Sequence, residues 1–232
     1  DEMIDSDSLS SLSSISCTDL FFSSFFSDDE DEKEQDRQEL DIKDSEFVIL
    51  GRSVSEKYDV LSQETMDSLR RHLPFLVQEE NFFLKYSLAR DGASLMTLLE
   101  RARNSPRTIL AIKTVDGDIF GAFTSSPWHD KGNNFYGSGE SFLWRSNNDF
   151  VDSRDDTCYA EDLRVSKFSV EAFSWTGANR NVQMSNLKRL IVGGGEPEIK
   201  ESTNGNSWGF GLTLDSDLYR GSSNCCATFG SP

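Results

Sequence analysis

The pattern of apolar and polar positions predicts two amphipathic helices near the start of a globular region. Residues 62–73 begin at a serine able to cap a helix, carry apolar side chains on one stripe and end before Pro74. Residues 94–102 begin at another such serine and place Leu95, Leu98, Leu99 and Ala102 at helical spacing. Both segments are expected to cover a core that other elements supply.

Short β-prone runs dominate the rest of the globular region. Residues 108–115 and 118–124 flank Asp116-Gly117, which predicts an antiparallel hairpin with a type I′ turn. Further short strands are expected, in chain order, at 47–50, 141–145, 170–175, 182–184, 189–192, 210–214 and 227–229. Many glycine-bounded strands with two helices in front indicate an α+β fold, an antiparallel β-sandwich of two sheets with flanking helices.

Charge divides the chain into a tail and a domain. Residues 1–46 hold 16 acidic and three basic residues, so −13 of the net charge of −17 lies there, among runs of serine. This composition favours a disordered acidic Ser-rich tail, with the domain spanning residues 47–232. The tail is interpreted as a solubilising leader. A second interpretation is a peptide that docks in a partner's groove through Leu9, Leu12, Ile15, Leu20 and four phenylalanines, with Ser27 as a phosphorylation candidate.

Composition also excludes several classes of partner and cofactor. Residues 47–232 carry 24 acidic and 20 basic residues, a balance that does not support nucleic-acid binding. No apolar run is long enough to span a membrane, and the first residues lack signal-peptide features, so a soluble, unsecreted chain is expected. The four cysteines and two histidines lack disulfide or metal-ligand spacing, so no disulfide, metal or cofactor is expected.

Three stretches invite catalytic interpretations, and a structural interpretation is preferred for each. Residues 137–141 lack the order of a nucleophile elbow, and a strand-like run follows where a dinucleotide loop needs a helix. A tight bend with Glu140 satisfying buried amides is preferred there. Residues 193–195, a glycine triplet followed by acids, indicate a turn or bulge and not a phosphate loop. Asp215 and Asp217 are expected to cap backbone groups and not to form a hydrolase with Glu140.

Five glycine- and aromatic-rich phrases follow one another in the second half of the chain. They occupy residues 135–142, 173–179, 193–196, 214–221 and 225–230. In this order they resemble the TLDc domain, the module of the eukaryotic oxidation-resistance proteins, and the resemblance covers residues 58–230. The positions that carry it are Gly137, Gly139, Glu140, Trp175, Thr176, Gly177, Gly193, Gly194, Gly195, Asp215, Asp217, Gly221, Cys226, Thr228 and Phe229.

The resemblance implies a protein-interaction module with no catalytic residues. It implies binding and regulation of the vacuolar-type proton ATPase through its peripheral subunits, and a contribution to oxidative-stress resistance. It also implies a location in the cytoplasm, at the surface of acidic organelles or in mitochondria. The alternative is a thiol-dependent antioxidant that acts through Cys226, which requires an exposed thiol near positive charge; a buried, inert cysteine is preferred.

Two departures from the family pattern are visible in the sequence. Residues 146–167 and 197–207 separate phrases that lie closer together in the TLDc pattern, so both are expected to be loop insertions. The chain stops at Pro232, where family domains continue with one further strand. Two interpretations are open: the chain is a fragment, which the absent initiator methionine favours, or the core lacks an edge strand and exposes an edge that another chain can complete.

Overall fold

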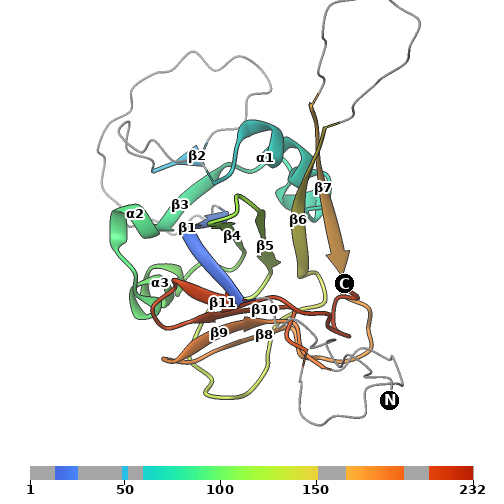
Figure 1. The fold of residues 1–232 in the computed structure, drawn as a ribbon. Helices are drawn as coiled ribbons and strands as arrows, with labels where there is room; N and C mark the ends of the chain where they lie inside the picture. Colours follow the sequence, from blue (N-terminus) through green and yellow to red (C-terminus); the bar gives the residue numbers. More distant parts are fainter. Residues whose placement is uncertain (1–13, 26–48, 52–59, 151–165, 196–208, 232) are drawn as a thin grey trace, which may run out of the picture.

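A computed structural model describes residues 14–25, 49–51, 60–150, 166–195 and 209–231 (Figure 1). The strands are β1 (Ser14–Phe25), β2 (Ile49–Leu50), β3 (Phe82–Ser87), β4 (Thr108–Thr114), β5 (Ile119–Thr124), β6 (Phe142–Phe150), β7 (Ser166–Ser174), β8 (Gln183–Ser185), β9 (Arg189–Val192), β10 (Leu212–Asp215) and β11 (Arg220–Ser222). The helices are α1 (Gln63–Arg70), the short 3-10 helix η1 (Phe75–Val77), α2 (Leu88–Asp91) and α3 (Leu95–Ala102).

The strands form two sheets that share β1. Sheet 1 has the order β2-β3-β1-β4-β5-β6-β7, and sheet 2 has the order β1-β11-β10-β9-β8. All these neighbours are antiparallel except β2 and β3, which are parallel. The α+β sandwich with flanking helices is therefore confirmed.

Sheet 1 is buried on both faces, which produces three layers. Along β4, Leu110 and Ile112 belong to the core cluster that faces sheet 2 and α3, whereas Ile109 and Ala111 belong to the cluster that faces α1. This alternation follows from the two-residue period of a strand. Each fully buried leucine or isoleucine contributes about 1.5–3 kcal/mol by leaving water.

Both predicted helices are present, with the predicted caps. The Ser62 hydroxyl accepts a hydrogen bond from the Thr65 amide (3.2 Å), and the Ser94 hydroxyl accepts one from the Thr97 amide (3.3 Å). The predicted stripe of α3 is buried. Helix α1 also protects an edge of sheet 1, because the Ser68 hydroxyl accepts a hydrogen bond from the Val170 amide of β7 (2.9 Å). An edge strand whose amide is satisfied in this way is less open to pairing with another chain.

The predicted hairpin is confirmed as β4 and β5, but its predicted turn type is wrong. Lys113 pairs with Ile119, and Gly117 alone within the turn has a positive φ, of 94°. A type I′ turn requires positive φ at both central residues, whereas a longer turn needs only one residue in the left-handed region. The Thr114 hydroxyl accepts a hydrogen bond from the Asp118 amide (3.0 Å) and closes the loop.

Other strand boundaries differ from the sequence prediction. Strands β6 and β7 extend into 146–150 and 166–167, so both ends of the expected insertion at 146–167 are strands. Residues 151–165 and the expected insertion at 197–207 lie outside the described residues. The predicted strand at 227–229 is a turn, in which the Gly230 amide donates to the Cys226 carbonyl (3.0 Å). Strand β3 was not predicted, because its apolar run has no turn signal after it.

Strand β1 lies within the segment expected to be disordered. Ser14–Phe25 pairs with β4, β3 and β11, so this segment of apolar residues and serines forms an inner strand. Backbone pairing on both sides outweighs the weak β-propensity of serine in this position. The rest of the expected tail, residues 1–13 and 26–46, lies outside the described residues. The division into a tail and a domain therefore stays a prediction for those parts.

Candidate functional site

The family-motif residues gather mainly at one end of sheet 2, around Thr228. The Thr228 side chain is buried, and its hydroxyl accepts a hydrogen bond from the Gly194 amide (2.9 Å). Its hydrogen has acceptors within reach at the Asn179 Oδ1 (2.8 Å) and the Gly194 carbonyl (2.6 Å). The Asn179 Nδ2 in turn donates to the Gly194 carbonyl (3.0 Å). We call Thr176, Asn179, Gly193, Gly194 and Thr228 the Thr228 cluster.

Thr176 connects the end of β7 to the same cluster. Its amide donates to the Thr228 carbonyl (2.9 Å) and its hydroxyl donates to the Ala227 carbonyl (2.6 Å). Trp175, the preceding residue, donates from Nε1 to the Asn179 carbonyl (2.7 Å). The two Thr176 bonds satisfy carbonyls of the turn at residues 226–230, and the Trp175 bond satisfies a carbonyl in the loop after β7.

Two motif glycines are explained by close packing. Gly193 has φ of 77°, and a Cβ there would lie 2.8 Å from the Cys226 sulfur and 2.9 Å from the Phe229 ring. A Cβ on Gly139 would lie 2.4 Å from the Trp175 ring. Any larger residue at either place would displace an aromatic side chain of the site.

Glu140 does not perform the role expected from the sequence. Its side chain is exposed, and no amide of the described residues donates to its carboxylate. Only its backbone amide has a local bond, to the Ser138 hydroxyl (3.3 Å). The interpretation that Glu140 satisfies buried amides is therefore wrong, because serine and tryptophan contacts hold this bend instead.

The two adjacent cysteines differ in exposure. Cys226 is 1 % exposed and lies in the core between the sheets, with its sulfur 3.5 Å from the Ser231 hydroxyl. Cys225 is exposed. The preferred interpretation of Cys226 as a buried thiol agrees with this geometry, since a reactive thiol requires access to its oxidant.

The remaining acidic motif residues lie at the opposite end of sheet 2. Asp215 pairs with Arg189 there, whereas Leu212 pairs with Val192 next to the Thr228 cluster. The Asp217 carboxylate accepts a hydrogen bond from the Tyr219 amide (3.1 Å), as the backbone-capping interpretation predicted. We call residues 215–219 the Asp217 turn.

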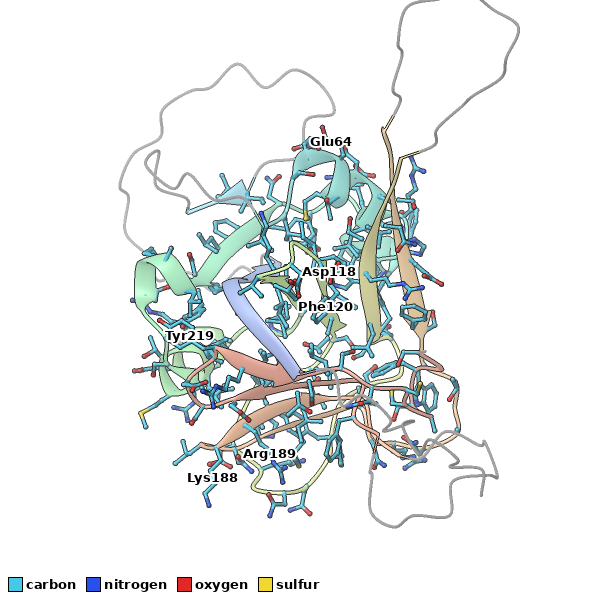
Figure 2. The ribbon with its side chains drawn as sticks, in the orientation of Figure 1. Glu64, Asp118, Phe120, Lys188, Arg189 and Tyr219 are labelled. Atoms are coloured by element: carbon cyan, nitrogen blue, oxygen red, sulfur yellow. The ribbon has the colours of Figure 1, made fainter. Side chains whose placement is uncertain are left out.

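The Asp217 turn combines a buried residue and an exposed one. Leu218 has φ of 57° and a fully buried side chain, and the Ser216 carbonyl accepts a hydrogen bond from the Leu95 amide at the start of α3 (3.1 Å). Tyr219, the next residue, is 52 % exposed. Figure 2 shows it beside α3, at the end of the sheet where Arg189 also lies.

Ion pairing supports the helices beside this turn. Burial raises the pKa of Asp91, but hydrogen bonds from Arg90 and the Ser87 amide, with the charges of Arg90 and Arg101, outweigh burial and place the pKa below its usual value. Burial raises the pKa of the neighbouring Tyr86 hydroxyl, which donates to the Gly92 carbonyl. The hydrogen bond from the Ser94 amide opposes this effect, and the charges of Asp91 and Tyr219 add to it.

The acidic motif residues do not form a shared site. Glu140 precedes β6 beside Gly139 and Trp175, whereas Asp215 and Asp217 lie at the other end of sheet 2. Within the described ranges, no three histidine, cysteine, aspartate or glutamate side chains are arranged to hold a metal ion. The geometry gives the hydrolase interpretation no support, because a carboxylate pair must flank one substrate bond.

A groove of about 520 Å³ lies between the ends of the two sheets. Its described lining includes Asp118 and Phe120, which Figure 2 labels, together with Asp116 and Phe173. Arg145 also belongs to the lining, and its guanidinium lies 2.8 Å from the Glu171 carboxylate and 5.5 Å from the Phe173 ring centre. The described lining contains no histidine, cysteine, lysine or tyrosine, and its hydroxyl groups belong to Thr114, Ser146, Ser223 and Ser231.

The sequence reasoning missed one exposed apolar pair. Phe75 and Leu76, on η1 directly after Pro74, are 86 % and 76 % exposed. The available signal was the position of two large apolar residues outside both helical stripes, just after the proline that ends the first segment.

In the part of the chain that the structure describes, no helix has the length and apolar character needed to cross a membrane.

Fold and site together define an antiparallel β-sandwich domain whose motif residues build a hydrogen-bonded cluster at one end of a sheet. The chain belongs to the TLDc domain family, whose model matches residues 54–232. It is 32 % identical over 191 residues to oxidation resistance protein 1 of Yarrowia lipolytica, covering 78 % of this chain and 70 % of that protein.

Animal relatives are longer than this chain. Human nuclear receptor coactivator 7 is 32 % identical over 172 residues, which are 73 % of this chain and 15 % of that protein. Mouse oxidation resistance protein 1 is 30 % identical over 179 residues, which are 77 % of this chain and 17 % of that protein. The similarity to these two proteins thus concerns less than a fifth of their length.

Proposed function

We propose that this chain is a non-catalytic protein-interaction module that binds and regulates the vacuolar-type proton ATPase and contributes to resistance against oxidative stress. Membership of the TLDc family supports the proposal, as do the relatives named oxidation resistance protein 1. The proposed location is the cytoplasm, the surface of acidic organelles or mitochondria.

One observation carries the non-catalytic part of the proposal. The Thr228 side chain is buried, and the hydroxyls of Thr228 and Thr176 are hydrogen-bonded to backbone groups. A group engaged in this way fixes the shape of the chain and is not free to activate a substrate.

The proposed contact surface is the exposed part of the Asp217 turn. Tyr219 is held by a capped turn and a bond to α3, so its backbone is fixed while its ring remains open to solvent. A rigid exposed tyrosine suits a binding hot spot, because it buries a large area at little cost in conformational entropy.

The test measures retention of the purified peripheral sector of the proton pump on the immobilised chain at physiological salt. We expect native protein to retain the sector and Tyr219→Ser to bind it at least tenfold more weakly. Phe75→Ser is the matched control, since Phe75 is 86 % exposed on η1, which does not belong to sheet 2. If neither variant loses binding, the Tyr219 surface is not the contact surface. If the native protein does not retain the sector, the pump is not the partner.

The thiol alternative makes a different prediction. Burial of Cys226 weakens the thiol alternative, because an oxidant must reach the sulfur. Cells that depend on the protein for survival in peroxide should be protected equally by native protein and by Cys226→Ser, with Cys225→Ser as the exposed control. Protection lost in Cys226→Ser, with unchanged circular dichroism and melting temperature, would instead establish the thiol mechanism.

A further inference from the structure

Strand β1 is paired on both sides over much of its length. Cys17 to Ser24 run alongside β4, Phe21 to Phe25 run alongside β3, and Ser14 to Ser16 run alongside β11. In the described order of sheet 1, β1 separates β3 from β4, and it also joins the two sheets. Removal of β1 would leave backbone donors and acceptors open on three strands.

The covalent attachment of β1 is long. Residues 26–48 separate it from β2, and 24 peptide steps extend to roughly 80 Å at most. A domain the size of residues 47–232 has a radius of gyration of roughly 16 Å. The connection therefore does not force β1 into its position by its length, and backbone pairing must hold the strand there.

The pairing of β1 is also irregular. Its register shifts between Cys17 and Asp19 against β4, and between Phe22 and Ser23 against β3. Such shifts leave ladder positions imperfectly paired. Four of its residues are serines, at 14, 16, 23 and 24, a residue type outside the β-prone class. These features weaken the pairing of β1 relative to a regular strand of β-prone residues.

We propose that the position between β3 and β4 is an acceptor site for an extended peptide, and that residues 14–25 of this chain are its exchangeable, tethered occupant. Recognition is by strand addition, in which the backbone ladder supplies affinity and the side chains supply register. An incoming segment runs antiparallel to both β3 and β4, as β1 does. This proposal concerns the sheet itself and does not depend on pump binding.

The tether explains why the chain occupies its own site. An unstructured chain of 24 steps has a root-mean-square span of roughly 27 Å. A tether of this kind holds its ligand at an effective concentration on the order of 1 mM. A free peptide at micromolar concentration therefore competes poorly until the tether is cut.

The experiment uses the full chain with a specific protease site inserted after Gln35, within the connection. A fluorescent peptide of residues 14–25 is added to cut and uncut protein, and its anisotropy is measured. We expect saturable binding to cut protein and at least tenfold weaker binding to uncut protein. Equal binding to both forms would overturn the proposal. So would an N-terminal fragment that neither dissociates nor exchanges while the cut protein keeps its native circular dichroism.

Register supplies a second, independent test. Asp19 is the register partner of Lys113 on β4, and opposite charges at such positions favour pairing. The Asp19→Lys peptide should bind cut native protein severalfold more weakly than the native peptide, and should recover its binding to cut Lys113→Glu protein. A Phe22→Pro peptide should not bind, because Phe22 pairs with both Leu110 and Tyr86. Equal binding of the native and proline peptides would overturn the proposal without requiring any protein variant to fold.

Discussion

The two ends of sheet 2 carry family-motif residues in very different surroundings. Around Thr228, hydroxyl and amide side chains are hydrogen-bonded to backbone, the Thr228 side chain is buried, and Gly193 has no room for a side chain. At the Asp217 turn, one buried leucine anchors the loop while Tyr219 and Met96 project toward solvent. The first end is closed by its own contacts, and the second leaves apolar surface available.

This contrast separates two reasons for a residue to belong to a motif. A residue in the Thr228 cluster is explained by the shape of the backbone, because replacing it disturbs bonds inside the domain. The exposed ring of Tyr219 has no such explanation, since packing accounts for Leu218 and capping accounts for Asp217. Substitutions at the closed end should therefore change stability, and those at the open end should change binding.

Gly193→Ala should cause the largest loss of stability. The new Cβ meets the Cys226 sulfur and the Phe229 ring below 3.0 Å, and alanine is strained at φ of 77°. Strain and overpacking together cost about 2–4 kcal/mol, measured as the free energy of unfolding in urea. Gly177→Ala is the matched control, since Gly177 has φ of 79° with nothing within 4 Å. Equal losses in the two variants would mean that packing at Gly193 contributes nothing.

Thr228→Val tests whether hydrogen bonding holds the closed end together. Valine keeps the shape of threonine but leaves the buried Gly194 amide without its acceptor, which costs about 1–3 kcal/mol. Thr228→Ser keeps the hydroxyl and loses one methyl group, so it should cost about 0.8 kcal/mol. Urea unfolding of both variants compares them directly. A serine variant less stable than the valine variant would show that packing, and not the hydroxyl, dominates at this end.

The closed end shows which parts of the site the sequence could predict. Gly193, Thr228 and Trp175 were singled out by their motif phrases, but none of the phrases indicated that Asn179 joins them. Contacts between residues 15 and 49 positions apart depend on sheet topology, which a local pattern does not contain. Glu140 was misinterpreted for the same reason, since its exposure follows from the way the chain passes Trp175.

The elements of the fold also divide into those that local sequence signals predict and those that they do not. Helical spacing and capping serines identified α1 and α3, and the Asp-Gly turn identified β4 and β5, because these signals are local. Strand β1 gave no such signal, since its serines and neighbouring acids are typical of disordered segments. Its pairing depends on open positions on β3, β4 and β11, which are formed by distant parts of the chain.

Asp91→Asn should have a smaller, pH-dependent effect near the open end. Because the folded pKa of Asp91 is below its unfolded value, its charge stabilises the fold above about pH 4, and this contribution is lost as the pH falls through the folded pKa. Solvent screening limits the effect at pH 7 to less than about 1 kcal/mol. Urea unfolding of native and variant protein should differ at pH 7 and converge at lower pH. A difference that does not change with pH would show that charge is not the cause.

Tyr219→Ser should have the smallest effect on stability and therefore gives the sharpest separation of the two ends. The ring is half exposed, and surface substitutions usually change the free energy of unfolding by less than about 0.5 kcal/mol. The same variant should lose binding to the peripheral pump sector, whereas Thr228→Ser, at the closed end, should bind normally while it remains folded. Thermal melting and sector retention, measured on the same samples, test both halves of this expectation. If Tyr219→Ser destabilises the domain by more than about 1 kcal/mol, the tyrosine supports the fold, and a loss of its binding no longer identifies a contact surface.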